Sequence, residues 1–183
     1  MKILVNNEIV NFTKEDFPML INGKAFTQSG ASFFSVSLMT KLFEEGEKIV
    51  FFTALPPAKE LFRNQVGDKV NDKNIIIVES GDESSFIKEL DSITDLDERI
   101  ILFKNIEDYS ENLFNRLKNH KLIIFSGDVD RCVFGDKLFE MNFKTKIFFS
   151  YSDKLEVKDK IDLPKYNGHF IGERLSGVVR IEQ

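Results

Sequence analysis

Met19-Leu-Ile-Asn-Gly-Lys-Ala-Phe-Thr-Gln-Ser-Gly-Ala-Ser32 is the stretch that decides the fold of this 183-residue chain. Met19–Asn22 is predicted to form a buried strand, and residues 31–47 repeat apolar side chains at the spacing of one helix face. The glycine-containing loop of residues 23–30 is predicted to connect the strand to the start of the helix. Unpaired backbone N–H groups at such a helix start favour a bound anion.

This loop lacks one side chain of a working phosphate-binding loop. The P-loop pattern G-x-x-x-x-G-K-[ST] ends in glycine, lysine and a hydroxyl residue. Gly30 and Ser32 hold the glycine and hydroxyl positions, but Ala31 stands between them in place of lysine. That lysine normally reaches the β- and γ-phosphates. The loop could therefore cradle an anion with backbone N–H groups, without the usual charge for a triphosphate.

The rest of the chain alternates apolar strands with amphipathic helices. Further strands are predicted at residues 48–54, 74–78, 99–103, 121–125 and 146–150, and further helices at residues 57–66, 83–93, 107–119 and 130–142. This alternation predicts an α/β fold with a mostly parallel central sheet and helices on both faces.

Antiparallel hairpins are expected at both ends of the chain. Residues 1–12 contain two short apolar runs around an Asn6-Asn7 turn, and residues 168–183 contain two more. The second hairpin is predicted to close the sheet and to lie at its end, with a free strand edge. The length suits a single domain over residues 1–183.

Composition narrows the classes of function. The net charge is −5 with both signs mixed along the chain, which opposes a basic nucleic-acid-binding face. The single cysteine, Cys132, excludes an internal disulfide and favours a reducing compartment. His120 and His169 match no metal-ligand spacing, and no apolar stretch is long enough to span a bilayer. We expect a cytoplasmic protein with no metal and no membrane contact.

The order of elements is similar to that of the RecA-like branch of P-loop ATPases, which includes KaiC-type and RecA/DnaB-type domains. The similarity covers residues 19–182. It is strongest in Met-Leu-Ile-Asn-Gly…Ser-Gly-Ala-Ser, in the apolar helix that follows, and in Glu-Glu-Gly-Glu-Lys-Ile-Val-Phe-Phe-Thr-Ala. The alternative is an unrelated α/β domain in which Ser-Gly-Ala-Ser occurs by chance.

Carried over position by position, the resemblance fails where the family does its chemistry. Ala31 replaces the P-loop lysine. Ile100-Ile-Leu-Phe103 resembles the Walker B strand, and Lys104 follows it where the family has a metal-orienting aspartate. Leu55 lies near the position of the glutamate that activates water. Phosphoryl transfer needs neutralised phosphate charge, a bound Mg²⁺ and an oriented water. The side chain that the family uses for each of these three purposes is absent from this chain.

The resemblance still implies a set of candidate binding residues. By spacing, the first loop glycine falls at Ala25, or Gly23 fills that role in a loop two residues longer. The candidates for nucleotide or anion binding are Gly23, Lys24, Ser29, Gly30, Ala31, Ser32 and Lys104, with Ser126 at a position where the family has a polar sensor.

Three of these candidates have competing interpretations. Lys104 would bring positive charge close to the missing lysine, attracting phosphate and repelling Mg²⁺, or it is a solvated strand end. Lys24 is similar in placement to the early lysine of deviant Walker A ATPases, or it is a solvated loop residue. Ser32 is expected to cap the helix rather than to bind a metal.

Three functions follow from these patterns. The leading hypothesis is a catalytically inactive RecA-like homologue that acts as a structural, regulatory or adaptor domain, without a cofactor and paired with itself or with a related ATPase subunit. The second is a domain that binds ATP or another phosphate ligand without Mg²⁺. The third is a nucleic-acid accessory module, supported only by Arg174 and Arg180 and opposed by the acidic net charge.

Overall fold

The computed structural model describes residues 2–24, 30–53, 55–78, 82–153, 157, 159–173 and 175–182. Its strands are β1 (Lys2–Val5), β2 (Glu8–Ile9), β3 (Met19–Asn22), β4 (Ile49–Phe52), β5 (Ile75–Val78), β6 (Ile100–Lys104), β7 (Ile123–Gly127), β8 (Thr145–Phe148), β9 (Gly168–Gly172) and β10 (Ser176–Glu182). In the described residues they form one ten-stranded sheet, in the order β2-β1-β10-β9-β8-β3-β7-β6-β4-β5.

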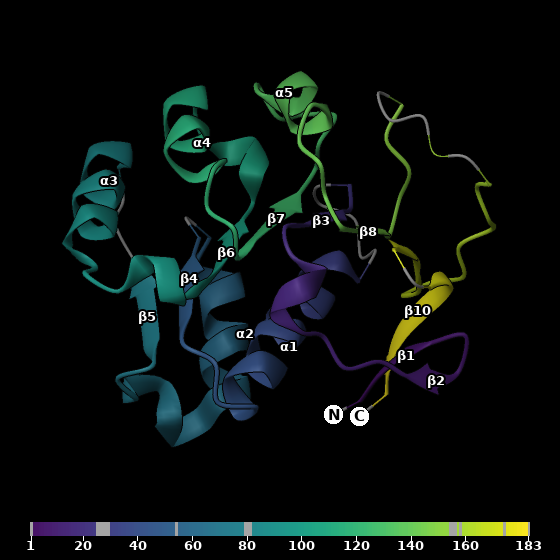
Figure 1. Cartoon of the computed structure of the whole chain (residues 1–183), viewed down its shortest axis with the longest axis horizontal. Helices are drawn as coiled ribbons and strands as arrows, with labels where there is room; N and C mark the ends of the chain where they lie inside the picture. Colours follow the sequence, from purple (N-terminus) through teal and green to yellow (C-terminus); the bar gives the residue numbers. More distant parts are fainter. Residues whose placement is uncertain are drawn as a thin grey trace.

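Most of this sheet is parallel, and one end is antiparallel (Figure 1). The neighbours from β8 through β3, β7, β6 and β4 to β5 all run in the same direction. β9 runs antiparallel to β8 and β10, β10 to β1, and β1 to β2. The predicted α/β fold with a mostly parallel sheet and a closing antiparallel hairpin is confirmed.

Helices cover both faces of the parallel part. α1 (Ala31–Glu44) and α2 (Pro56–Val66) pack on one face, and α3 (Glu83–Ser92), α4 (Glu111–Leu117) and α5 (Gly135–Phe139) pack on the other. Short 3₁₀ turns are η1 (Lys14–Asp16), η2 (Gly67–Asn71), η3 (Leu96–Glu98) and η4 (Ile106–Asp108). None of the helices in the described ranges is long and apolar enough to cross a membrane.

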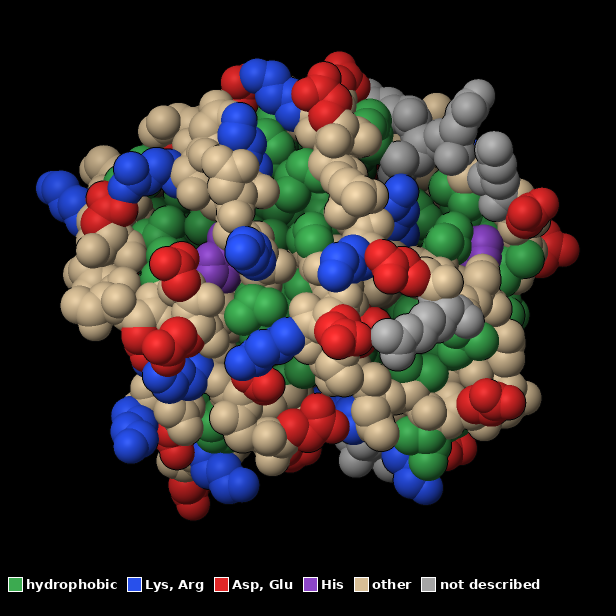
Figure 2. Space-filling model, in the orientation of Figure 1, with side chains coloured by type: hydrophobic (Ala, Val, Ile, Leu, Met, Phe, Trp, Pro, Cys, Tyr) green, Lys and Arg blue, Asp and Glu red, His purple; other side chains and the backbone are tan. Residues whose placement is uncertain are grey.

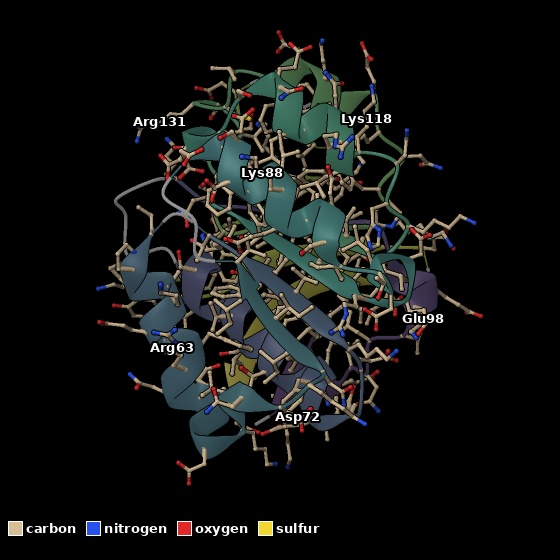
Figure 3. All side chains as sticks on the ribbon, turned by 90° about the vertical axis from the view of Figure 1, so that its left-hand side faces the viewer. Arg63, Asp72, Lys88, Glu98, Lys118 and Arg131 are labelled. Atoms are coloured by element: carbon tan, nitrogen blue, oxygen red, sulfur yellow. The ribbon has the colours of Figure 1, made fainter. Side chains whose placement is uncertain are left out.

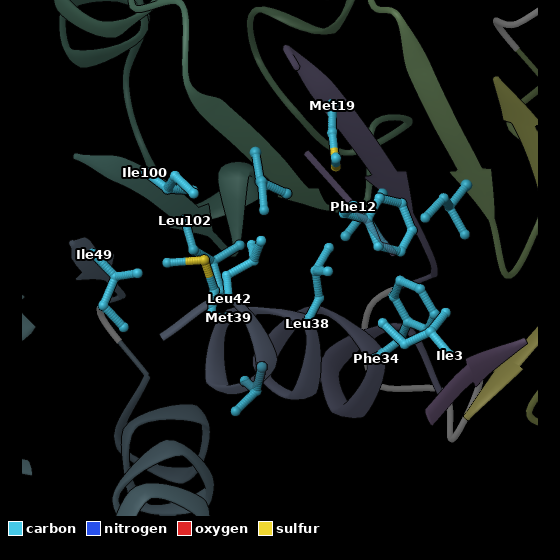
Figure 4. Packing of buried hydrophobic residues seen from close by; sticks show 14 of the residues in the cluster. Ile3, Phe12, Met19, Phe34, Leu38, Met39, Leu42, Ile49, Ile100 and Leu102 are labelled. Carbon is cyan, nitrogen blue, oxygen red and sulfur yellow. The ribbon is translucent and has the colours of Figure 1, made fainter. Parts of the chain in front are cut away.

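Alternate residues of the parallel strands β3, β4, β5, β6 and β7 belong to two separate hydrophobic cores. In β6, Ile100 and Leu102 join the cluster under α1 and α2, whereas Ile101 and Phe103 join the cluster under α3, α4 and α5. Figure 4 shows the first cluster, with Leu38 of α1 directed at the strands. This alternation identifies the face to which any residue further along a strand belongs.

Three helices are shorter than predicted by more than one residue. α1 ends at Glu44 rather than at residue 47, and Gly46 beyond it adopts a left-handed φ of 96°. α4 begins after Ser110 rather than at residue 107, because the Ser110 side chain accepts a backbone N–H of the first turn. α5 covers only part of residues 130–142.

The two hairpins pair with each other. Asn6 and Asn7 adopt positive φ of 52° and 69° between β1 and β2, which confirms the first hairpin. β1 then pairs with β10, and Val5 lies opposite Val179. The termini meet in Figure 1 for this reason. The prediction of a terminal hairpin with a free edge is wrong, because β10 lies between β9 and β1; the sheet edges in the described part are β2 and β5.

Candidate anion site at the carboxyl edge of the sheet

The carboxyl ends of β3, β7 and β6 adjoin one another at the centre of the sheet. After β3 the chain continues to α1 on one face of the sheet, and after β7 it continues to α5 on the other face. Open α/β sheets bind ligands at the carboxyl ends of neighbouring strands whose following connections go to opposite faces of the sheet. The predicted candidates of the described part lie at or after the carboxyl ends of these strands: Gly23, Lys24, Gly30, Ala31 and Ser32 follow β3, Lys104 ends β6, and Ser126 lies in β7 as the register partner of Lys104. Ser29, like Ala25, lies outside the described residues.

The loop after β3 is anchored at its base by a buried amide. Asn22 donates from Nδ2 to the carbonyl of Ser150 at 2.7 Å, and its Oδ1 accepts the N–H of Val129 at 3.1 Å. The N–H of Gly23 donates to the carbonyl of Gly127 at 3.1 Å. Lys24 has an exposed side chain, and its backbone N–H donates to Ser150 Oγ at 2.9 Å. The base of the loop is therefore fixed to β7 and to the segment after β8.

Gly30 begins α1 in a conformation that favours glycine. It is the N-cap residue with φ 93°, and its carbonyl accepts the N–H of Phe34 at 2.8 Å. A Cβ at Gly30 would lie 3.3 Å from Cα of Tyr166. Ala31 is buried as the first helical residue, and Ser32 is exposed in the first turn. The expectation that Ser32 caps α1 is therefore wrong, because the cap position belongs to Gly30.

Lys104 is the most unusual residue of this edge. As the last residue of β6 it is only 2% exposed, so the interpretation as a solvated strand end is wrong. Figure 3 shows the usual arrangement, with Arg63, Lys118 and Arg131 at the periphery of the molecule. Burial lowers the pKa of the Lys104 ammonium from 10.5 to about 8, and the charges of Glu107 and Asp108 partly oppose this. No described residue forms a hydrogen bond or ion pair with this ammonium.

Ser126 lies beside Lys104 in the neighbouring strand. The two residues are register partners in β7 and β6. Ser126 is fully buried, and its Oγ has no hydrogen-bond partner in the described structure. The predicted sensor position is thus a buried hydroxyl next to a buried cation. The Ser126 hydroxyl is an exception to the rule that buried polar groups have hydrogen-bond partners.

Polar residues that the sequence did not single out shape the rest of the edge. Asn105 has φ 62°, and its Oδ1 accepts from Thr53 Oγ1 at 3.1 Å. Glu107 accepts the N–H of Asp128 on its Oε2 at 2.9 Å. Thr53, Asn105, Glu107 and Asp128 all follow the observed end of a parallel strand, and for the last three the predicted strand ends were the signal available in the sequence. Leu55, near the expected water-activating glutamate, is the N-cap residue of α2 and offers no carboxylate.

An apolar groove of about 520 Å³ flanks the start of α1. Two aromatic side chains in it are partly open to solvent, Phe33 at 37% and Tyr166 at 54%. Its lining residues are Gly30, Ser32, Phe33, Phe34, Leu61, Tyr166 and Ile181. The sequence did not predict this groove, since its walls come from α1, α2, β10 and the segment before β9.

Metal-ligating side chains and surface charges are distributed as follows over the described residues. Within the described ranges, no group of three or more His, Cys, Asp and Glu side chains is arranged to hold a metal ion. Acidic and basic side chains are interspersed on the face in Figure 2. Arg180 is exposed on β10, whereas Arg174 lies outside the described residues.

No protein-family model matches this chain, and no curated protein is similar to it. Function is therefore inferred from the residues and their geometry.

Proposed function

We propose that this chain is a RecA-like P-loop domain that does not hydrolyse ATP and that acts as a structural, regulatory or adaptor domain. The observation that carries this proposal is the buried lysine at the end of β6. Lys104 lies where the resemblance puts the aspartate that orients the metal, and it is 2% exposed. A buried ammonium repels the Mg²⁺ that hydrolysis requires.

Two further positions support the loss of hydrolysis. Ala31 is the first residue of α1, where the family has the lysine that reaches the phosphates. Leu55 precedes α2, where the family has a carboxylate that activates water. The positions for the phosphate charge, the metal and the water thus lack their side chains together.

The arrangement of the elements supports the RecA-like part of the proposal. The buried strand β3 leads through the anchored residues Gly23 and Lys24, and the long, mostly buried helix α1 begins after Gly30. β6, which resembles the Walker B strand, lies two positions from β3 in a mostly parallel sheet. The sheet ends in antiparallel strands, as the resemblance implies. Pairing with itself or with a related ATPase subunit belongs to the same proposal.

Steady-state phosphate release with ATP and Mg²⁺ tests the loss of hydrolysis. The wild-type rate should equal that of a no-enzyme control, since losing one charged transition-state contact in such enzymes costs about 10³–10⁵ in rate. The matched control is Gly30→Trp, which fills the start of α1. Release well above background in the wild type, abolished by Gly30→Trp, would overturn the proposal.

A further inference from the structure

β5 is an open edge of the sheet. In the described part of the chain it pairs with β4 and has no neighbour on its outer side. Figure 3 views the molecule from this side and shows strands between α3, which carries Lys88, and α2, which carries Arg63. The four residues of β5 are all aliphatic. Proteins usually protect a sheet edge with charged residues or proline, or by covering it, so β5 is a template for another strand.

The backbone of Ile77 is directed away from the sheet. Ile49 of β4 donates its N–H to the carbonyl of Asn74 at 2.8 Å. Alternate residues of a parallel strand bond to the same neighbour, so Asn74 faces β4, whereas Ile75 and Ile77 face outward. The N–H of Ile75 is already used, since it donates to the carbonyl of Asp72 at 2.9 Å. Ile77 therefore presents both a donor and an acceptor at the edge.

A second copy of the same strand fits these two groups. At every second position of an antiparallel pair, residues directly opposite each other exchange both N–H···O=C bonds. When Ile77 lies opposite Ile77 of a second copy, each N–H meets the other carbonyl, and the two residues lie on a two-fold axis. Ile76 then lies opposite Val78 of the other copy. Every cross-strand pair within β5 is thus aliphatic on both faces of the sheet.

The side chains at this edge have apolar surface left to bury. Ile77 packs against the cluster under α1 and α2, and Ile76 packs against the cluster under α3, α4 and α5, but both are only partly buried. A two-fold axis perpendicular to the sheet keeps each face of one copy beside the same face of the other. Both apolar clusters would therefore continue across the paired edges, and burial of this surface favours association.

We propose that the protein forms a two-fold dimer in which β5 of one copy pairs antiparallel with β5 of the other about Ile77. The sheet is then continuous across both copies. This inference rests on one part of the proposed function, the pairing of the domain with itself, and it names the surface and the partner for that pairing.

Analytical ultracentrifugation over a wide range of protein concentration, together with amide hydrogen exchange measured by NMR, tests the dimer. The mass should rise to twice that of the monomer, and the N–H of Ile77 should become protected over the same range. The matched control is the N–H of Ile9 at the opposite edge. Ile9 also faces outward, because its neighbour Val10 donates to the carbonyl of Ile3 at 2.9 Å, and it should stay unprotected.

Proline substitution tests the donor directly. Ile77→Pro removes an N–H that faces away from β4, and such an edge position tolerates proline. This variant should weaken dimerisation at least tenfold. Ile9→Pro makes the same change at the edge formed by β2 and should dimerise like the wild type. Circular dichroism verifies that each variant is folded, and the amide exchange of the wild type decides the question if Ile77→Pro is not.

Three outcomes would overturn the proposal: a wild type that stays monomeric at every concentration, a dimer in which the N–H of Ile77 stays unprotected, or a folded Ile77→Pro variant that dimerises like the wild type. The first outcome would leave a different chain as the partner. Phosphate release is a separate measurement, so a monomer without ATPase activity would overturn the dimer and leave the loss of hydrolysis standing.

Discussion

At the scale of single residues, Lys104 imposes a cost on folding that depends on pH. Its pKa is about 8 in the folded protein against 10.5 in the unfolded chain, because burial disfavours the charged form. The unfolded chain therefore holds this proton more tightly. The cost is complete below pH 8, falls as the pH rises, and is gone above pH 10.5. A shift of this size corresponds to about 3 kcal/mol.

Lys104→Met should therefore stabilise the protein at pH 7 by up to about 3 kcal/mol. The gain should shrink between pH 8 and pH 10.5 as the wild-type ammonium loses its proton. Urea unfolding at pH 7 and pH 10 measures both quantities, with Lys88→Met as the exposed control. A gain that is the same at both pH values would mean that packing, rather than the buried charge, is responsible.

Ser126, like Lys104, is a buried polar residue whose burial is expected to destabilise the fold, but its side chain is uncharged. A buried hydroxyl with no partner costs about 1–3 kcal/mol, so Ser126→Ala should be neutral or stabilising by about 1 kcal/mol. Ser35 is the matched control, because it is also fully buried but donates from Oγ to the carbonyl of Ser32 at 3.1 Å. Ser35→Ala should show no such gain. If chemical unfolding shows that both alanine variants lose stability equally, Ser126 has a structural partner after all.

At the scale of elements, local patterns predicted the β3–loop–α1 unit and most strand positions, because apolar runs and helix periodicity are encoded in neighbouring residues. Local patterns predicted a helix over residues 130–142, but α5 covers only Gly135–Phe139, because contacts with residues far away in the sequence shape the preceding segment. Asn22, which is far away in sequence, accepts the N–H of Val129 at 3.1 Å, and Glu107 accepts the N–H of Asp128. These contacts hold the start of that segment in turns. The sequence likewise identified Lys104 as a candidate but could not show that it is buried.

The buried face of α1 gives a direct test of its predicted orientation. Phe34 is 1% exposed within the core, whereas its neighbour Phe33 is 37% exposed. Phe34→Ala should destabilise the protein by about 3–5 kcal/mol, because it leaves a large cavity. Phe33→Ala should change stability by less than about 0.5 kcal/mol. Urea unfolding of the two variants provides the comparison, and equal effects would contradict the packing of α1.

At the scale of the whole molecule, the pairing of β1 with β10 changes where another chain could add to the sheet. Sequence patterns cannot show this pairing, because it joins opposite ends of the chain. The edge at β2 is only two residues long and carries Glu8, and short charged edges discourage strand addition. β5 at the opposite edge is apolar, with Ile76 and Ile77 partly buried. Self-association through the sheet, which stays a prediction, is therefore expected at β5 rather than at the terminal hairpin.

Val179 distinguishes an interior strand from an edge. It is fully buried, and β10 is hydrogen-bonded on both sides, to β9 and to β1. Val179→Lys should therefore destabilise the whole domain by several kcal/mol, since it buries an unpaired charge. Arg180→Glu, at the exposed neighbouring position, should leave stability nearly unchanged. Thermal unfolding and light scattering of both variants separate the alternatives: a stable Val179→Lys protein that only loses self-association would mean that β10 is an open edge and that the pairing with β1 is wrong.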